Sequence, residues 1–353
     1  MIVNKLFTKG KKKMKYLSVA VPCYNSQDYM CHCIDSVLSA KDDVEIIIID
    51  DGSKDKTGEI ADGYAKKYPE TVRVIHQENS GHGEGVNRGV LNAKGKYFKV
   101  VDSDDWLNEE ALAKLLRRIK EDNEKNTLPD MYICNYVYEH SADNTTYTMG
   151  YKNIFPEGRP FTWDEMGRFK TAQCLMMHSV VFKTDFLQNG YVCLPKHTFF
   201  VDNLFMYRPL PNVKKIVYLD LDLYRYFIGR DDQSVNEKMV IKRIDQQIYI
   251  TKLMIESHNL KIIKEKNPKL YRYMMHNLAI MMIINAAFSF LSKDKEKINN
   301  FYEIWKDIKN DDKYLYRHLS YMSPAILTRL PGVPGRKIYT TGYKIAKKIV
   351  KFN

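Results

Sequence analysis

The sequence offers little that would cross-link the chain or hold zinc. Its six cysteines are scattered, at Cys23, Cys31, Cys33, Cys134, Cys174 and Cys193. Cys31 and Cys33 flank a histidine, but no second ligand pair follows at the spacing of a zinc site. We therefore expect reduced thiols that fill the core of a cytoplasmic protein.

The chain also lacks a hydrophobic run that would comfortably span a membrane. The most apolar stretch, residues 274–291, contains one histidine and two asparagines, so we expect a buried helix there. Residues 1–15 hold six lysines and no apolar segment of signal-peptide length. We interpret them as a basic arm, in which either Met1 or Met14 can be the first residue.

Acidic residues are the minority charge. Fifty-five lysines and arginines oppose 43 aspartates and glutamates, which gives a formal net charge of +12. This surplus favours an anionic partner, whether a nucleotide, a phospholipid surface or a nucleic acid. Because zinc-finger spacings and aromatic RNA-binding runs are both missing, we expect no nucleic-acid partner.

What the chain does have is an alternation of strand-like and helix-like segments in its first third. A run that is apolar apart from one residue, such as residues 44–49 with Glu45, is typical of a central parallel strand. The alternation predicts a parallel, doubly wound α/β sheet. The predicted strands are residues 16–23, 44–49, 71–76 and 96–101, and the predicted helices are residues 28–40, 55–68, 83–93 and 108–123.

The fourth predicted strand ends in three acids within four residues, Asp102, Asp104 and Asp105. Like charges this close are costly unless a cation neutralises them. Ligands on open α/β sheets bind beyond the carboxyl ends of strands, which is where these acids stand. We therefore predict a divalent metal held by Asp102 and Asp104, with Asp105 in reserve. The alternative is a turn before a helix that begins near residue 108.

Two nucleotide-binding motifs are absent. A dinucleotide-binding fold would carry GxGxxG directly after the first strand, where this chain has Pro22, Cys23 and Tyr24. The glycines at 81, 83 and 85 follow the third strand instead, and no Gly-Lys-Ser/Thr continues them. These absences argue against hydride transfer and against a P-loop.

Four motifs nevertheless match a known family in order and spacing over residues 16–123: VAVPCYNSQDYM, IIIIDDGSKDKT, NSGHGEGVNRG and KYFKVVDSDDW. Together they resemble the inverting family 2 glycosyltransferases of the GT-A fold, a Rossmann-like mixed sheet. The resemblance implies a metal-assisted enzyme that moves a sugar from a nucleotide-sugar, typically UDP-linked, to an acceptor hydroxyl in cell-surface polysaccharide or glycoconjugate synthesis.

The resemblance also assigns roles to residues of the first half. Tyr24 and Asp51 would contact a uracil-type base, Asp102 would lie near the ribose and donor sugar, and Asp104 would bind the Mn²⁺ or Mg²⁺ that bridges the diphosphate. The remaining donor-binding candidates are Pro22, Asn25, Gly81, His82, Asn87 and Ser103. Many relatives have an arginine before the asparagine of the third motif, whereas this chain has Val86.

In the second half, the resemblance places the catalytic base at Asp202, where relatives carry a Glu-Asp pair and this chain has Val201-Asp202. Inversion needs a carboxylate that removes the proton of the attacking hydroxyl. A helix N-cap is the structural alternative for Asp202. Arg230 and Ser234 match an element that closes over the diphosphate, although Ser234 also begins a capping-box pattern with Glu237.

We expect four parts: a basic arm (1–15), a catalytic domain (16–235, divided into 16–123 and 124–235), a helical appendage (236–330) and a basic amphipathic tail (331–353). Within the catalytic part we predict strands over 129–139, 147–151 and 214–227, and short helices over 161–169 and 183–189. The appendage should contain helices over 239–258, 269–291, 295–309 and 311–321, with interruptions at Pro324, Pro331 and Pro334.

The tail alternates isoleucines with lysines, a pattern typical of helices that lie on the inner face of the cytoplasmic membrane. The alternative is docking against its own domain or a partner subunit. The acceptor can be a glycan, a polyol phosphate or a lipid-linked molecule. Two other functions stay open: a different nucleotide-binding transferase on this fold, and an inactive, membrane-associated relative.

Overall fold

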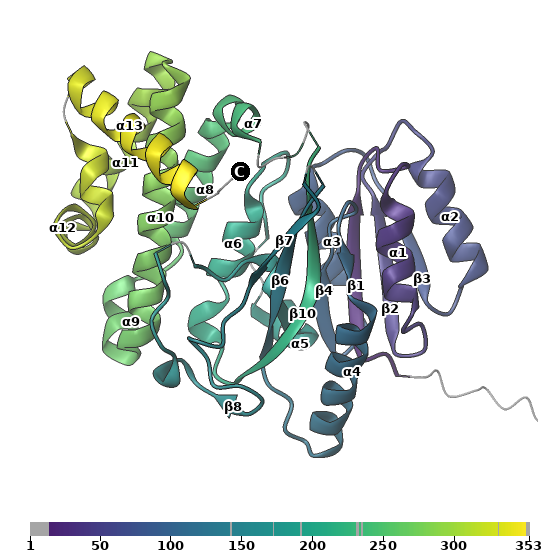
Figure 1. Cartoon of the computed structure of the whole chain (residues 1–353). Helices are drawn as coiled ribbons and strands as arrows, with labels where there is room; N and C mark the ends of the chain where they lie inside the picture. The colour runs from purple at the N-terminus through teal and green to yellow at the C-terminus, as the bar shows by residue number, and fades with distance from the viewer. Residues whose placement is uncertain are drawn as a thin grey trace, which may run out of the picture.

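A computed structural model describes residues 14–141, 143–171, 173–190, 193–230, 233, 236–330 and 332–350, with side chains to residue 345. Most of the predicted basic arm and Ser234 therefore lie outside the described residues. Figure 1 shows one large twisted sheet with helices on both faces, and a group of helices packed beyond its β6–β10 side.

The first half forms the predicted parallel, doubly wound sheet. At this end the strand order is β3-β2-β1-β4, with all neighbours parallel. Every residue of β1 and β2 is buried, which explains why both strands are mostly apolar. In chain order the elements are β1 (Leu17–Cys23), α1 (Met30–Leu38), β2 (Val44–Asp50), α2 (Thr57–Lys67), β3 (Val72–His76), α3 (His82–Asn92), β4 (Tyr97–Val100) and α4 (Glu109–Glu124).

The sheet then becomes mixed, in the order β4-β9-β6-β10-β5. Strand β9 is antiparallel to both β4 and β6, whereas β6 and β10 are parallel. This arrangement places the end of β10 against the acidic end of β4, because β5 connects the two. The elements are β5 (Trp106–Leu107), β6 (Met131–His140), β7 (Thr145–Met149), β8 (Pro160–Phe161), β9 (Val180–Lys183), α5 (Thr184–Gly190), α6 (Val201–Tyr207) and β10 (Ile216–Ile228).

The C-terminal helices pack around α10 (Pro268–Ser292). Within the described part of the chain, α10 alone is long and apolar enough to cross a membrane, but 72% of its most apolar window is buried inside the protein. It is the buried helix that the sequence predicts. The others are α7 (Glu237–Lys242), α8 (Ile244–Glu256), α9 (Leu260–Lys266), α11 (Lys295–Asp311), α12 (Lys313–Tyr321), the 3-10 segment η4 (Pro324–Arg329) and α13 (Gly332–Val350).

Residues 161–169 do not form the predicted helix. The chain runs through β8 and makes only a three-residue 3-10 turn over Trp163–Glu165. Trp163 is buried, and its Nε1–H donates to the Leu210 carbonyl. Its place is therefore set by packing against a distant segment rather than by helical periodicity.

Two helix boundaries also differ from the prediction. The helix expected over 239–258 breaks at Arg243 into α7 and α8. Pro334 does not interrupt the chain, because it lies in the first turn of α13, where a missing N–H removes no intrahelical hydrogen bond. The tail helix thus begins at Gly332, before Pro334.

All six cysteines are free thiols, as predicted, but they do not all fill the core. Cys23, Cys33 and Cys134 are buried, whereas Cys31 and Cys193 are exposed. The core-filling prediction is wrong for these last two. Cys31 lies on the outer face of α1, and Cys193 lies in an irregular segment before α6.

Candidate active site

The polar residues that follow β1 and β2 are fastened to each other. Asn25 has a left-handed backbone (φ +50°), its N–H donates to Ser53 Oγ at 3.0 Å, and its Oδ1 accepts the Lys54 N–H at 2.9 Å. The adjacent Tyr24 is 50% exposed, and Pro22 is buried at the end of β1. Asn25 thus joins the two loops and leaves the Tyr24 ring at the surface, where a base can meet it.

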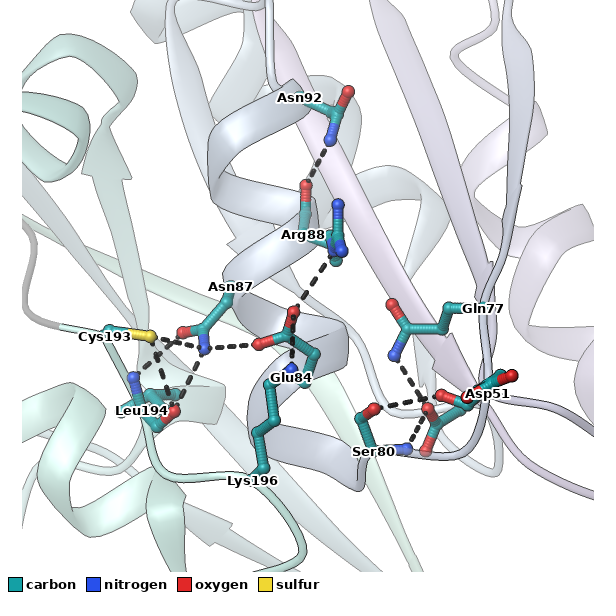
Figure 2. A network of polar contacts seen from close by, with 11 residues as sticks. Asp51, Gln77, Ser80, Glu84, Asn87, Arg88, Asn92, Cys193, Leu194 and Lys196 are labelled. Atoms are coloured by element: carbon teal, nitrogen blue, oxygen red, sulfur yellow. Dashed lines mark hydrogen bonds and ion pairs between the residues drawn. The ribbon is translucent and has the colours of Figure 1, made fainter.

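Asp51 is buried and organises the turn before α3 (Figure 2). Its Oδ1 accepts from Gln77 Nε2 at 2.7 Å and from the Ser80 N–H at 2.8 Å, and its Oδ2 accepts from the Gly81 N–H at 2.8 Å. The base contact expected of Asp51 stays a prediction. The structure adds a structural role, in which the same carboxylate holds the glycine turn by hydrogen bonds.

Asn87 also has partners within the chain. It is buried on α3, and its side-chain amide both donates to and accepts from the Leu194 backbone (Figure 2). A donor contact by this amide stays a prediction. Its observed partner is the irregular segment 193–200, which leads into α6, so Asn87 lies behind the site rather than at its surface.

The segment 193–200 lies directly on the glycine turn. Gly81 has φ +85°, and a Cβ there would come within 2.8 Å of the His197 nitrogen, so only glycine fits. The His197 N–H donates to the Ser80 carbonyl at 2.8 Å. Both His197 and Phe200 have positive φ angles, of 50° and 65°. The backbone of this segment is therefore tightly bent just before Asp202.

His82, the first residue of α3, pairs with Asp102 at the end of β4. The distance from His82 Nε2 to Asp102 Oδ1 is 2.7 Å, and both side chains are partly exposed. Burial alone would lower the pKa of His82, but the charge and hydrogen bond of Asp102, helped by Asp202 and Asp104, raise it. Burial would raise the pKa of Asp102, yet His82 lowers it. The ion pair is mutually stabilised.

Asp202 lies in the first turn of α6 and faces the same region. The N-cap of α6 is Phe200, so the capping alternative for Asp202 is wrong. Burial raises the pKa of Asp202, nearby Asp102 raises it further, and His82 opposes the shift. A carboxylate with a raised pKa holds a proton more readily, which suits a general base.

Asp104 is engaged by the loop that follows β10. Arg230 Nη1 lies 3.2 Å from Asp104 Oδ2, and Gln233 Nε2 donates to the same oxygen at 3.3 Å. The guanidinium carbon of Arg230 is 4.3 Å from the centre of the Tyr29 ring. Burial and the charge of Asp102 raise the pKa of Asp104. Arg230 therefore stands beside the acids, which is where its expected phosphate contact would need it.

Asp105 and Ser103 support the acidic strand end from inside. Asp105 is buried, accepts the Tyr224 hydroxyl at 2.5 Å and accepts the Phe227 N–H at 2.8 Å. Ser103 Oγ lies 2.9 Å from Ser26 Oγ. These bonds tie β4 to β10 and to the first motif. The metal contact of Asp105 and the donor contact of Ser103 stay predictions.

One potential metal ligand was not expected from the sequence. Among the described residues, ligand atoms of Asp102, Asp105 and His178 lie within 4.8 Å of one another. His178 is buried against the Tyr224 ring, and burial lowers its pKa to about 4, so the imidazole is neutral and able to ligate. No local signal marks His178, because it stands in an apolar stretch and reaches the acids only through β-sheet pairing.

Among the described residues, the cations that pair directly with these acids are His82 and Arg230. Val86, at the position where relatives have arginine, is fully buried, and Arg88 pairs with Glu84 at 3.2 Å. Ser234 lies outside the described residues. Its capping-box alternative is not supported, because α7 begins at Glu237 with Asn236 as its cap.

Comparison with known proteins relates part of this chain to a known family. The family model "Glycosyl transferase family 2" matches residues 18–186. Putative glycosyltransferase EpsH of Bacillus subtilis is 26% identical over 294 residues, which cover 79% of this chain and 77% of EpsH. Uncharacterized glycosyltransferase EpsJ of the same organism is 39% identical over 132 residues, 37% of this chain and 36% of EpsJ.

Two further proteins are similar to this chain. A poly(ribitol-phosphate) beta-glucosyltransferase of Bacillus spizizenii is 31% identical over 227 residues, and the match spans 62% of this chain but only 33% of that protein. The crystal structure of S. aureus TarS 1-349 with UDP-GlcNAc superposes with a TM-score of 0.64, at 19% identity, over 94% of this chain and 92% of that one. The predicted GT-A fold with C-terminal helices is confirmed.

Proposed function

The chain belongs to glycosyltransferase family 2, and we propose that it transfers a sugar, with inversion, from a UDP-sugar to a hydroxyl group of a cell-surface glycan. The observation that carries the proposal is the juxtaposition of His82, Asp102 and Asp202. His82 is paired with Asp102, and Asp202 lies close enough for its charge to raise the pKa of His82. The three residues come from α3, the end of β4 and α6.

In the proposed reaction, Asp202 accepts the proton of the acceptor hydroxyl. The hydroxyl oxygen forms the new bond to the anomeric carbon as the bond from that carbon to the diphosphate breaks, and UDP leaves with the electron pair. Because attack and departure occur on opposite faces, the configuration inverts and no covalent enzyme intermediate is needed. Protonated His82 would hold Asp102 in place and balance the charge of the acids.

The residues at the end of β4 suit a divalent cation such as Mn²⁺ or Mg²⁺. Oxygen ligands are available from Asp104 and Asp102, with Asp105 and the neutral imidazole of His178 next to them. Such an ion would neutralise the departing diphosphate as a Lewis acid. Arg230, at 3.2 Å from Asp104, would add a second positive charge, because a guanidinium matches phosphate oxygens in geometry.

For the donor, we infer UDP-sugar recognition by Tyr24 and Asp51. For the acceptor, we infer a glycan, a polyol phosphate or a lipid-linked molecule at the cytoplasmic side of the membrane. The similarity to a poly(ribitol-phosphate) beta-glucosyltransferase supports a polyol phosphate, and that to TarS, crystallised with UDP-GlcNAc, supports a UDP-sugar.

A thermal-shift screen of nucleotide-sugars in the presence of manganese tests this proposal. We expect UDP-sugars to raise the Tm and GDP-sugars to leave it unchanged, and the stabilising UDP-sugar to be hydrolysed slowly in the absence of acceptor. Stabilisation by GDP-sugars alone would overturn the UDP assignment. Donor binding without hydrolysis or transfer to any offered glycan would instead indicate an inactive relative.

A further inference from the structure

The far end of the helical appendage exposes an unusual number of large apolar side chains. Among the described residues fourteen such side chains are exposed, and seven of them lie between residues 321 and 345. These side chains come from α12, the adjoining η4 and α13, and we call them together the apolar–basic face: Tyr321, Met322, Ile326, Leu327, Val333, Ile338 and Ile345. Tyr321 and Met322 are the most exposed, at 70% and 74%.

The charge of this region is of one sign. From residue 313 to the last residue of the sequence there is no aspartate or glutamate, but there are nine lysines and arginines. The formal net charge of the whole chain is +12, so most of the surplus is concentrated here. Among these cations, Lys313, Arg317, Lys337 and Lys344 have exposed side chains.

The apolar side chains stand on a well-packed support. Trp305 Nε1 donates to Thr328 Oγ1 at 3.2 Å, and Arg329 donates to the Tyr316 hydroxyl at 2.7 Å, which fixes η4 against α11 and α12. With Thr328 buried, the neighbouring Ile326 and Leu327 are exposed. Their exposure thus follows from how η4 is held.

Helix α13 is held in a similar way. The Tyr339 hydroxyl donates to the Ile283 carbonyl at 2.8 Å, and the Tyr343 ring lies 5.7 Å from that of Phe288, both on α10. Ile338 and Ile345 are seven residues apart, so they share another stripe of the helix, and both are exposed. Figure 1 shows α12 and α13 at the end of the molecule opposite α2.

We propose that the apolar–basic face docks the protein on an anionic phospholipid bilayer, with Met322, Leu327 and Ile338 entering the headgroup region and the cations on lipid phosphates. Apolar side chains beside lysines are the composition of interfacial membrane anchors. A second copy of the chain is a poor occupant, because it would bring the same cations against these. The inference goes beyond sugar transfer and uses no residue of the candidate active site.

Vesicle flotation with the purified full-length chain tests the proposal. We expect the protein to float with vesicles of phosphatidylcholine and phosphatidylglycerol, to remain unbound with pure phosphatidylcholine, and to dissociate in high salt. M322S with L327S should weaken partitioning about tenfold, and K337E with K344E at least as much, since each cation near a lipid surface contributes substantially to binding.

A matched control removes exposed apolar side chains elsewhere. L91S with Y249S alters two exposed residues, on α3 and α8, and should float as the unchanged protein does. Equal binding to neutral and anionic vesicles, or full binding by the M322S/L327S variant, would overturn the proposal. If light scattering shows that this variant changes its oligomeric state, and no vesicle binding is observed, the proposal is also overturned. Because flotation needs no nucleotide-sugar donor, membrane binding is tested independently of sugar transfer.

Discussion

Asn87 and Leu194 hold each other by two hydrogen bonds: the Leu194 N–H donates to Asn87 Oδ1 at 3.0 Å, and Asn87 Nδ2 donates to the Leu194 carbonyl at 3.0 Å. One amide thus satisfies both polar groups of a residue far away in the chain. The segment that it fastens leads to Asp202, and a further hydrogen bond of this segment, from the His197 N–H to the Ser80 carbonyl, leads back to Asp51. The proposed base and the proposed uracil contact are therefore connected through one turn.

Replacing Asn87 with alanine should loosen this connection. Two backbone groups of Leu194 would lose their partner, which costs about 1–3 kcal/mol of folding stability. Misplacement of Asp202 should lower kcat about 10- to 100-fold while KM for the donor changes little. Asn92→Ala is the matched control, because Asn92 lies on the same helix and its side chain donates to the Arg88 carbonyl of that helix rather than to segment 193–200. Equal kinetics for the two variants would contradict the positioning role.

Asp202→Asn should abolish transfer and leave UDP binding intact. Loss of a general base costs about 10²- to 10⁴-fold in rate. Because burial raises the pKa of Asp202, kcat of the unchanged enzyme should begin to fall, on the acid side, at a higher pH than for an ordinary carboxylate. Asp185→Asn, in the first turn of the neighbouring α5, is the control. Retained turnover in Asp202→Asn would disprove the base assignment.

Asp104→Ala should remove the dependence of donor binding on manganese. Calorimetric titration with UDP, with and without a chelator, measures this directly. In the unchanged protein the chelator should weaken binding, whereas in the variant it should have no further effect. His178→Ala distinguishes the two ligand sets, since Asp102, Asp105 and His178 form the alternative group. If the chelator leaves UDP affinity of the unchanged protein untouched, the metal proposal is wrong.

The His82–Asp102 ion pair should make stability depend on pH. The folded-state pKa of His82 is raised by Asp102, so its contribution is complete below the unfolded-state value of 6.5 and is lost as the pH rises through the folded-state pKa. His82→Gln should therefore lower the Tm more at pH 6 than at pH 9. His258→Gln is the comparison, because burial lowers the pKa of His258. The pH dependence of its effect on Tm should therefore have the opposite sign, with a smaller loss at pH 6 than at pH 9. A pH-independent loss in His82→Gln would exclude a charged pair.

Much of the fold could be predicted because local patterns and tertiary environment agree. The strands β1 and β2 are mostly apolar and wholly buried, and the predicted helix after Asn108 is capped by Asn108, whose side chain accepts the Ala111 N–H. Where packing overrides local preference, prediction failed. Trp163 sits in a 3-10 turn because Leu210 holds it, and Arg243 divides a segment whose apolar periodicity looks continuous.

The sequence by itself determined the parallel sheet, the acidic end of β4 and the similarity to family 2 glycosyltransferases, because each depends on residues adjacent in the chain. Only the tertiary structure decided the partners of those acids. His82, His178 and Arg230 reach Asp102, Asp105 and Asp104 from α3, from the turn before β9 and from the loop after β10. No spacing rule joins residues that far apart, since chain packing alone brings them within a few ångströms. The apolar–basic face arises likewise, because the docking of α13 and η4 decides which side chains are left exposed.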